Sequence, residues 1–412
     1  MFQLISDLSY LLAKPVMSFV LRKKLYPEDA ISRKYGEIPE DGFEKTDRVI
    51  MFHAVSVGEV NALENLVKAT KKHFPERKIV VTTGTHTGQD IAKKKLGETA
   101  DLITYFPADF PCVVKKFLDK VNPEQVCIAE TEIWPNFITE CKKRGIKTYV
   151  INGRISDSTY KSYLTFKLIF KYFLSKYTGI YTQSDEDNDK FLSLGANPET
   201  TKRMNNLKFD VKQPEVNFDF DKCGSKVFLA ASTHSGEDEI VLYNYRRLKE
   251  KHPELKLIIA PRHLTRGDEV KALVESFKFN YDLRSNNRTS LEGIDVLILD
   301  TLGELGKMFK FSDLSFIGGS FNKTGGHNPL ESLVFGVPVI SGPSIHNFKD
   351  IYAIIKNSES GFVVQDRDEF FAVADKMLSD DEFYNRIKSN GVKVFEEQQG
   401  ALEFVLSLLS KS

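Results

Sequence analysis

Residues 314–340 read LSFIGGSFNKTGGHNPLESLVFGVPVI and carry the clearest structural signal in the chain. The apolar residues 314–317 predict a short strand, and a glycine-rich loop follows them. Pro329 suits the first turn of a helix, and residues 337–340 predict the next strand. A strand, a loop, a helix and a second strand in this order indicate a parallel sheet with crossover helices.

The glycine-rich loop is a candidate anion site. Glycines let a ligand approach the backbone, and free N–H groups at a helix N-terminus favour a phosphate. Glu331, one turn into the helix, can accept hydrogen bonds from sugar hydroxyls. The structural alternative stays open, in which Glu331 caps the helix and the glycines form a tight turn. The loop matches neither the dinucleotide fingerprint nor the P-loop, which argues against a dehydrogenase or an NTPase.

The composition bounds the class of protein. The 412 residues suffice for two domains, and 41% hydrophobic with 28% charged residues is typical of a globular chain. Lys+Arg and Asp+Glu both number 57, so no global field attracts nucleic acid. The four cysteines show no close metal-ligand spacing, and such sparse use fits a reducing compartment.

Short apolar strands alternate with helical stretches in two series. The first series is predicted at Arg48–His53, Lys78–Thr83, Gln125–Ala129, Thr148–Asn152 and Gly179–Gln183. The second is predicted at Lys226–Ala230, Leu255–Ala260, Asp295–Leu299, Leu314–Ile317 and Val337–Ile340. Two such series predict two doubly wound α/β domains. Ligands of these sheets bind beyond the carboxyl ends of the strands, so we expect both domains to present their loops to one cleft.

Two segments suggest contact with a membrane. Apolar residues at helical spacing within 1–25, followed by Arg22, Lys23 and Lys24, predict an amphipathic interfacial helix. The alternative is a helix packed on the body of the protein. The segment Tyr160–Tyr177 combines aromatic and basic side chains, which suits a membrane interface or a phosphorylated lipid. For this segment a buried amphipathic helix is the favoured interpretation.

Polar side chains follow several strands of the first series. Ser56 and Glu59 form an ordinary capping box or, alternatively, place Glu59 as a general base at a strand end. Glu130 and Glu132 follow another strand, where paired carboxylates are costly without a partner or a task. Lys208 can meet a phosphate or a developing negative charge, or be a solvated surface lysine. In the second series, polar loops at 231–237, 260–263 and 300–305 follow strands at the edge where nucleotides bind.

These motifs together resemble the 3-deoxy-D-manno-octulosonic acid (Kdo) transferase family of lipid A biosynthesis. The resemblance runs from about Phe52 to the C-terminus, and the order and number of its motifs make it specific. The motifs are HAVSVGEV (53–60), TTGTHTGQ (82–89), AETEIWPN (129–136), NGRISDSTY (152–160), NLKFD (206–210), ASTHSGE (231–237), APRH (260–263), DTLGEL (300–305) and GGSFNKTGGHNPLE (318–331).

The resemblance implies an inverting glycosyltransferase of the GT-B arrangement, with two Rossmann-like domains facing a cleft. The donor would be CMP-Kdo, and the acceptor a tetraacyldisaccharide bisphosphate lipid A precursor at the cytoplasmic face of the inner membrane. Glu59 would be the general base, with Glu130 and Lys208 stabilising the transition state. No metal or other cofactor is expected. The implied CMP-binding residues are Pro261, Arg262, Leu302, Gly303, Glu304, Asn328, Pro329, Leu330 and Glu331.

The expected organisation divides the chain into five parts. These are a membrane-associated helix at 1–25, an acceptor-binding domain at 26–207, a linker at 208–225, a CMP-Kdo-binding domain at 226–390 and a C-terminal helix at 391–412. Two alternative functions stay open: another GT-B transferase that uses a UDP-sugar, and an inactive nucleotide-binding membrane scaffold.

Overall fold

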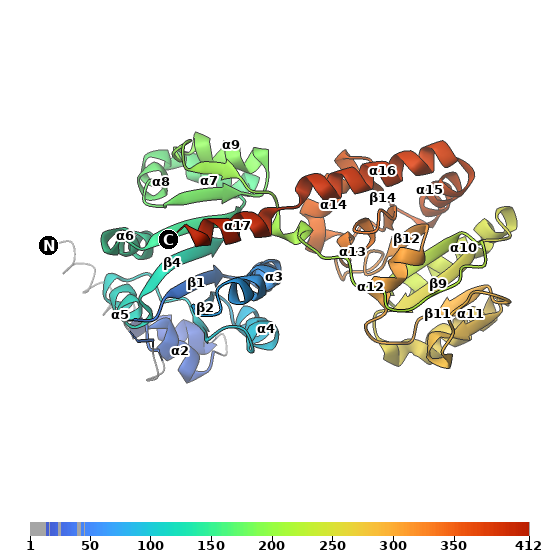
Figure 1. Cartoon of the computed structure of the whole chain (residues 1–412), viewed down its shortest axis with the longest axis horizontal. Coiled ribbons are helices and arrows are strands. Elements are labelled where there is room, and N and C mark those ends of the chain that lie inside the picture. Colours follow the sequence, from blue (N-terminus) through green and yellow to red (C-terminus); the bar gives the residue numbers. More distant parts are fainter. Residues whose placement is uncertain (1–13, 16, 24–25, 39–42, 45, 412) are drawn as a thin grey trace. The chain divides into compact units, whose positions relative to one another are not determined.

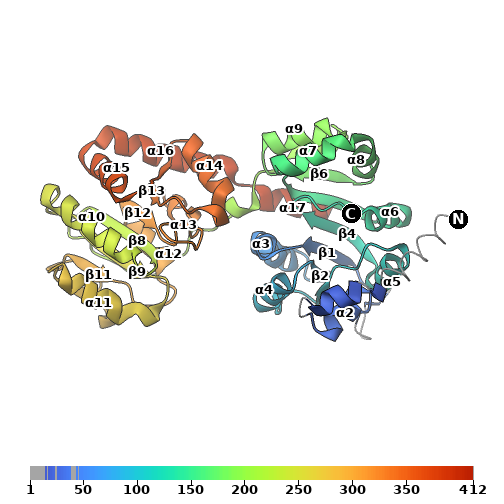
Figure 2. The same cartoon turned by 180° about the vertical axis from the view of Figure 1, so that it is seen from behind.

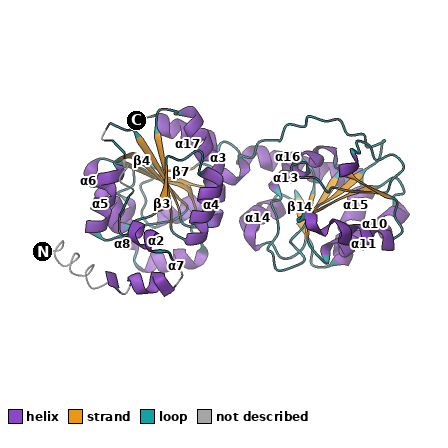
Figure 3. Ribbon diagram, turned by 90° about the horizontal axis from the view of Figure 1, so that it is seen from below, coloured by secondary structure: helices purple, strands orange, loops and turns teal. Residues whose placement is uncertain are grey.

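The computed structural model describes residues 14–15, 17–23, 26–38, 43–44 and 46–411. They form two compact units (Figures 1 and 2). Unit 1 contains residues up to Asp210 together with Gln399–Ser412, and unit 2 spans Val211–Gln398. Figure 3 shows helices packed around the strands within each unit. Each unit is a parallel α/β sheet with its own core, as the two strand series predict.

Unit 1 is built on a seven-stranded sheet of order β3-β2-β1-β4-β5-β6-β7, and its paired strands are parallel among the described residues. The strands are β1 Val49–Ala54, β2 Lys78–Thr83, β3 Leu102–Tyr105, β4 Pro123–Ala129, β5 Lys147–Gly153, β6 Gly179–Thr182 and β7 Thr201–Arg203. The helices are α2 Glu28–Lys34, α3 Val57–His73, α4 His86–Leu96, α5 Pro111–Val121, α6 Pro135–Arg144, α7 Asp157–Thr165, α8 Lys167–Leu174, α9 Asp185–Ser193, the 3₁₀ turn η1 Leu207–Phe209 and α17 Ala401–Ser410.

Unit 2 repeats this plan with the strand order β10-β11-β9-β8-β12-β13-β14. Its strands are β8 Val227–Thr233, β9 Lys256–Pro261, β10 Tyr281–Leu283, β11 Val296–Ile298, β12 Leu314–Ile317, β13 Val339–Ser341 and β14 Gly361–Val363. Its α-helices are α10 Glu237–Lys251, α11 Gly267–Ser276, α12 Leu305–Met308, α13 Leu330–Leu333, α14 Lys349–Asn357, α15 Arg367–Ser379 and α16 Asp381–Gln398. Its 3₁₀ turns are η2 Leu264–Arg266, η3 Arg284–Asn286, η4 Phe309–Phe311 and η5 His346–Phe348.

Burial explains why these segments form strands. Every residue of β1 and of β8 is buried, because helices cover both faces of a parallel sheet and leave no face for water. In each sheet the strand order reverses beside a central strand, with β1 between β2 and β4, and β8 between β9 and β12. Loops that follow these strands therefore diverge at the carboxyl edge, which is where α/β sheets bind ligands.

The segment expected as a linker at 208–225 does not stand apart from the two units. Asp210 belongs to unit 1, where its carboxylate accepts hydrogen bonds from the backbone N–H groups of Gly400 (2.9 Å) and Leu402 (2.7 Å). From Val211 the chain belongs to unit 2, and the Phe220 ring packs 5.4 Å from the Phe311 ring. Apolar side chains and a carboxylate thus fix both ends of this stretch.

The expected boundary at 390/391 falls inside a helix, because α16 continues without a break to Gln398. The C-terminal helix is instead α17, which begins at Ala401 after Gly400 in the left-handed conformation. Figure 1 shows α17, at the red end of the chain, among the elements of unit 1. Val405, Leu406 and Leu409 are buried in the core cluster that includes Leu63 of α3. Apolar burial therefore makes α17 part of the first unit.

Candidate active site

Glu59 lies at the carboxyl end of the central strand β1, in the first turn of α3. Its Oε1 accepts a hydrogen bond from the Ser56 hydroxyl at 2.8 Å, and its Oε2 accepts one from the Val55 N–H at 2.7 Å. Ser56 Oγ in turn accepts from the Glu59 N–H at 3.4 Å. The capping box foreseen from the sequence is thus present. It holds the carboxylate in one orientation, and only 8% of the residue is exposed.

Two further carboxylates lie near Glu59. Burial raises the pKa of Glu59, and the charge of Glu130 raises it further. Burial also raises the pKa of Glu132 to about 7, with contributions from Glu59 and Glu130. Two buried acids with raised pKa values and a third acid whose charge raises both, at one strand edge, have the character of an acid–base site. The structure therefore brings together the predicted Glu59 and Glu130.

Glu132 was outside the predicted catalytic set, although its position as the second acid of the pair was visible in the sequence. The backbone around it is tightly held. The Tyr177 hydroxyl donates to the Glu132 carbonyl at 3.1 Å, and the Glu130 N–H donates to the Ile151 carbonyl at 3.0 Å. Glu130 has a φ of 56°, a left-handed conformation that costs a non-glycine residue on the order of 1 kcal/mol. Such strain is concentrated at functional sites.

A group of aromatic rings lies at the same end of β1. The His53 ring is tilted against that of Phe106 with centroids 4.1 Å apart, and Phe106 lies 5.2 Å from the Trp134 ring. His53 Nδ1 lies 3.0 Å from the Thr82 hydroxyl, and burial lowers the pKa of His53 to about 3. The histidine is therefore neutral at physiological pH. It does not compete with the acids for protons.

Lys208 lies on η1, at the same carboxyl edge of unit 1. The Asn206 side chain accepts from the Lys208 N–H at 3.0 Å and donates to Gln183 Oε1 at 2.9 Å. The Leu207 N–H donates to Asn152 Oδ1 at 3.0 Å, which ties η1 to the end of β5. The backbone of Lys208 is thus fixed while its side chain stays partly exposed. Its proposed contact with developing negative charge stays a prediction.

In unit 2, Glu237 determines the conformation of the glycine-rich loop. Its Oε1 accepts from the N–H groups of Ser320 and Phe321, each at 2.8 Å, and its Oε2 from Gly319 at 2.7 Å. Oε2 also accepts from the His234 N–H at 2.9 Å, and the residue is 1% exposed. These N–H groups are therefore not available to a phosphate, and α13 is a single turn. In residues 319–321 a carboxylate of the protein itself thus takes the place expected for an anion, while nucleotide binding by Asn328–Glu331 stays a prediction.

A positively charged side chain, that of Arg262, lies beside the loop. Arg262, directly after β9, has an exposed side chain, and its N–H donates to the Thr233 carbonyl at 2.9 Å. Its charge acts on His234, His327 and Glu331, which places all three near the guanidinium. An exposed guanidinium can bind a phosphate with two hydrogen bonds.

The imidazoles of His234 and His327 meet at 2.8 Å between their Nε2 atoms. One of them must donate and the other accept, so the pair shares a proton. Burial lowers the pKa of His327 to about 4, and Arg262 nearby adds to the effect. Neither histidine was predicted as a site residue, although His234 lies in ASTHSGE and His327 in the glycine-rich loop.

The other predicted donor-binding residues have varied surroundings. Leu302 is 85% exposed and Gly303 has a φ of 79°, whereas Glu304 pairs with Arg284 at 2.6 Å. Pro261 ends β9 and is buried.

In the segment 328–331 the side chains differ in accessibility. Asn328 Oδ1 accepts from the Leu330 N–H at 3.2 Å, and Pro329 precedes α13. Leu330 is 1% exposed, so its side chain packs in the core and only its backbone can contact a ligand. Burial raises the pKa of Glu331, and Arg262 opposes the shift. Glu331 is thus the side chain of this segment with an electrostatic link to the positive group.

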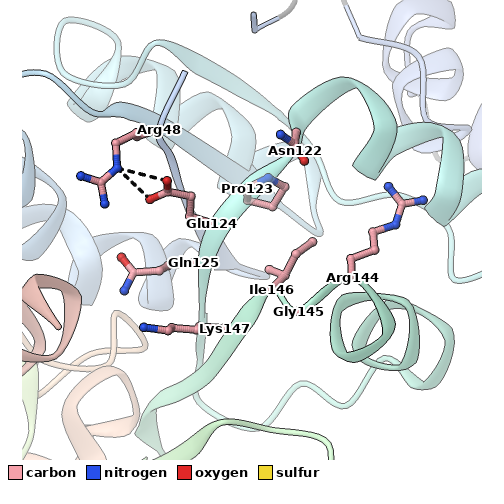
Figure 4. Close-up of a pocket in the computed structure, with 9 residues that line it drawn as sticks. All are labelled: Arg48, Asn122, Pro123, Glu124, Gln125, Arg144, Gly145, Ile146 and Lys147. Atoms are coloured by element: carbon pink, nitrogen blue, oxygen red, sulfur yellow. Dashed lines mark hydrogen bonds and ion pairs between the residues drawn. The ribbon is translucent and has the colours of Figure 1, made fainter. Parts of the chain in front are cut away.

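A pocket of about 380 Å³ in unit 1 lies at the opposite edge of the sheet (Figure 4). Arg48 precedes β1, while Pro123 begins β4 and Lys147 begins β5, so this pocket opens at the amino ends of the strands. Arg48 pairs with Glu124 at 3.1 Å across it. Ligands of parallel sheets bind at the other edge, so the pocket is separate from the candidate site. In the part of the chain that the structure describes, no group of three acidic, histidine or cysteine side chains is arranged to hold a metal ion.

Two Rossmann-like parallel sheets in one chain form the GT-B fold, which glycosyltransferases use. Residues 29–211 match the family described as 3-Deoxy-D-manno-octulosonic-acid transferase (kdotransferase), and residues 231–394 match Glycosyl transferases group 1. The 3-deoxy-D-manno-octulosonic acid transferase of Haemophilus influenzae is 34% identical over 368 residues, 87% of this chain and 86% of that protein. The chain belongs to the Kdo transferase family.

Two further relatives frame this assignment. A bifunctional glycosyltransferase/methyltransferase of Fusobacterium nucleatum is 33% identical over 95% of this chain, which spans 61% of that protein. UDP-GlcNAc 2-epimerase from Neisseria meningitidis bound to UDP-GlcNAc aligns with a TM-score of 0.54 over 89% of this chain and 100% of that one, at 12% identity. The second likeness concerns the fold alone. The predicted fold class and family are confirmed.

Proposed function

We propose that this protein transfers Kdo from CMP-Kdo to the tetraacyldisaccharide bisphosphate precursor of lipid A, with inversion at the anomeric carbon. The observation that carries the proposal is the buried carboxylate of Glu59 at the carboxyl edge of unit 1, in a chain that belongs to the Kdo transferase family. Glu130 and Glu132 surround this carboxylate with negative charge, which favours uptake of a proton.

In the proposed reaction, Glu59 takes the proton of an acceptor hydroxyl. The oxygen forms a bond to the anomeric carbon of Kdo while the bond from that carbon to the phosphate oxygen breaks, and CMP leaves with the electron pair. One displacement inverts the configuration. Glu130 and Lys208 would stabilise the charges that develop. Arg262 would neutralise the charge of the leaving phosphate, and none of these steps uses a metal or other cofactor.

The donor can be identified by competition. We expect CMP to displace a fluorescent CMP derivative from the protein, and UDP to require at least a tenfold higher concentration. The alternative that uses a UDP-sugar makes the opposite prediction. Equal competition by the two nucleotides would contradict the choice of CMP-Kdo as the donor.

The lipid acceptor implies work at a membrane, and we propose the cytoplasmic face of the inner membrane. Among the described residues, no helix is both long and apolar enough to span a bilayer. Most of the helix expected at 1–25 lies outside the described residues. Residues 14–15 and 17–23 are helical, with Phe19 68% exposed. A surface contact, as expected for an amphipathic helix, is therefore the proposed mode.

A second surface supports this mode. The segment 160–177, for which burial was favoured, includes most of α7 and all of α8. One part of its apolar side chains packs on the core, as Leu174 and Tyr177 do, and another part is exposed. We call this surface the α7–α8 patch: Leu164 (40% exposed), Phe166 (58%), Leu168 (83%), Ile169 (54%) and Tyr172 (59%). The exposed Lys161, Lys167 and Lys171 interleave with it. Apolar side chains with a basic rim suit an anionic lipid surface, and packing on the body of unit 1 does not cover them.

We expect the double variant Leu168→Asp, Ile169→Asp to bind vesicles containing phosphatidylglycerol about tenfold more weakly than the wild type. Two apolar anchors are lost and two negative charges meet the anionic lipid. Vesicle cosedimentation measures the effect. Val392→Asp, at a residue of unit 2 that is 39% exposed, is the matched control. If the double variant binds the vesicles as strongly as the wild type, the α7–α8 patch does not contact the membrane.

A further inference from the structure

Lys34, the last residue of α2, is a cation without an acidic partner. Its Nζ donates to the Gly84 carbonyl at 2.9 Å, and no described acidic side chain forms an ion pair with it. Burial lowers the pKa of Lys34 to about 8, and no neighbouring acid opposes the shift. Most lysines leave their charge in water, so a partly buried ammonium that lacks a counter-ion indicates a place for an anionic ligand.

Aromatic rings surround this ammonium. The Lys34 Nζ lies 5.0 Å from the Tyr105 ring centroid and 5.5 Å from that of Tyr26. The Tyr26 ring lies 5.8 Å from Tyr105 and 5.8 Å from His86. His86 Nδ1 lies 2.9 Å from the Tyr105 hydroxyl. Tyr105 is 3% exposed, so its ring supports the ammonium from within, whereas Tyr26 is only partly buried and His86 is exposed. The rings of Tyr26 and His86 can therefore contact a sugar, and the ammonium can bind a phosphate.

The group lies at the same sheet edge as the candidate base. Gly84 follows β2, and its N–H donates to the Val55 carbonyl at 3.2 Å. The N–H of Val55 donates to Glu59 Oε2 at 2.7 Å. Val55, directly after β1, is thus hydrogen-bonded both to Gly84, which accepts from Lys34, and to the Glu59 carboxylate. A ligand bound at Lys34 would extend from the place where we propose the acceptor hydroxyl is deprotonated.

The same group adjoins the helical residues 14–15 and 17–23. The Tyr35 hydroxyl, next to Lys34 in the chain, donates to the Lys14 carbonyl at 2.9 Å and lies 2.6 Å from the Ser18 hydroxyl. The Lys14 ammonium lies 5.1 Å from the Tyr35 ring centroid. The segment proposed to lie on the membrane is therefore attached beside Lys34. A charged lipid headgroup at the membrane surface would therefore lie close to Lys34.

We propose that Lys34, with Tyr26 and His86 beside it, binds a phosphate group on the sugar headgroup of the acceptor, while the buried Tyr105 holds the ammonium in place. This inference rests on the proposed function and assigns residues to the recognition of its acceptor. Lys34 acts as a point charge toward the phosphate, and the rings of Tyr26 and His86 hold the sugar that carries it. The recognised chemistry is a phosphate monoester on a lipid-linked sugar.

Steady-state kinetics of Lys34→Met tests the proposal with three acceptors: the bisphosphate, and the same lipid lacking one or the other phosphate. We expect Lys34→Met to raise the KM for the bisphosphate 10- to 100-fold, as for loss of a hydrogen bond to a charged group. The KM for CMP-Kdo should not change. Removal of the recognised phosphate from the acceptor should raise the KM of the wild type by a similar factor, and should hardly change the KM of Lys34→Met.

Two controls separate recognition from a structural role. Lys34→Arg should recover most of the affinity, and Lys94→Met, at an exposed lysine of α4, should match the wild type. A KM for Lys34→Met that rises equally for all three acceptors would overturn the proposal.

Equilibrium binding of the same lipids, followed by the fluorescence of Trp134, is measured in parallel without donor. If binding depends on both Lys34 and the phosphate but the kinetic assay with CMP-Kdo shows no transfer, the proposed function is refuted and this inference stands. Binding that ignores the phosphate would overturn the inference alone.

Discussion

Glu59→Gln is expected to lower the kcat for Kdo transfer by about 10²- to 10⁴-fold, the range for loss of a general base. The amide keeps the size of the side chain and can still accept one hydrogen bond, but it cannot take a proton. Because Glu59 lies in unit 1 and the predicted donor residues lie in unit 2, the Kd for CMP should not change. A discontinuous assay of CMP release and a CMP titration measure the two quantities.

The capping role of Glu59 needs its own control, because the carboxylate also holds the start of α3. Ser56→Ala removes the cap while keeping the acid, and should cost about 1 kcal/mol of stability with less than a tenfold loss of rate. Turnover of Glu59→Gln within tenfold of the wild type would exclude Glu59 as the base.

The pH dependence gives a second readout for Glu59. The base works ionised, and burial raises its pKa. The rate of the wild type should therefore fall as the pH drops through this raised pKa, from a plateau above it. In Glu59→Gln that limb of the profile should be absent.

Glu237→Ala should destabilise unit 2 by about 3–5 kcal/mol. Its carboxylate accepts four backbone hydrogen bonds, and its loss leaves four N–H groups without this partner, three of them in the glycine-rich loop. For a unit of this size the loss corresponds to a fall in Tm on the order of 10 °C. Affinity for CMP should fall as well, because the loop leads directly to Asn328–Glu331. Scanning calorimetry with and without CMP measures both effects.

Glu239→Ala is the matched control for Glu237→Ala. It removes an exposed acid from the same first turn of α10, so the interaction with the helix dipole changes equally. Its Tm should stay within about 2 °C of the wild type, as for surface substitutions. Equal Tm values for the two variants would show that the carboxylate does not hold the loop.

Much of the fold follows from the sequence because buried parallel strands are nearly continuous apolar runs. The strand predicted at Arg48–His53 is observed at Val49–Ala54, and the one predicted at Thr148–Asn152 at Lys147–Gly153. Capping residues placed Glu59 and the start of α3 correctly. Local chemistry within a few residues decides such features, so one sequence suffices to predict them.

Contacts between distant residues could not be predicted in the same way. Glu237 meets its loop partners 82–84 positions later in the chain, and the sequence around it indicates only a helix cap. Lys34 and Gly84 are 50 positions apart. The α7–α8 patch has the amphipathic pattern of a buried helix, and only tertiary packing shows that its apolar side chains are exposed.

Incubation of the purified protein with CMP-Kdo and the tetraacyldisaccharide bisphosphate tests the transfer of Kdo itself. We predict a lipid product heavier by one or more Kdo residues, formed together with an equal amount of CMP, and its absence with Glu59→Gln. A wild-type protein that binds CMP and the acceptor but forms no such product would contradict the account and favour an inactive nucleotide-binding scaffold.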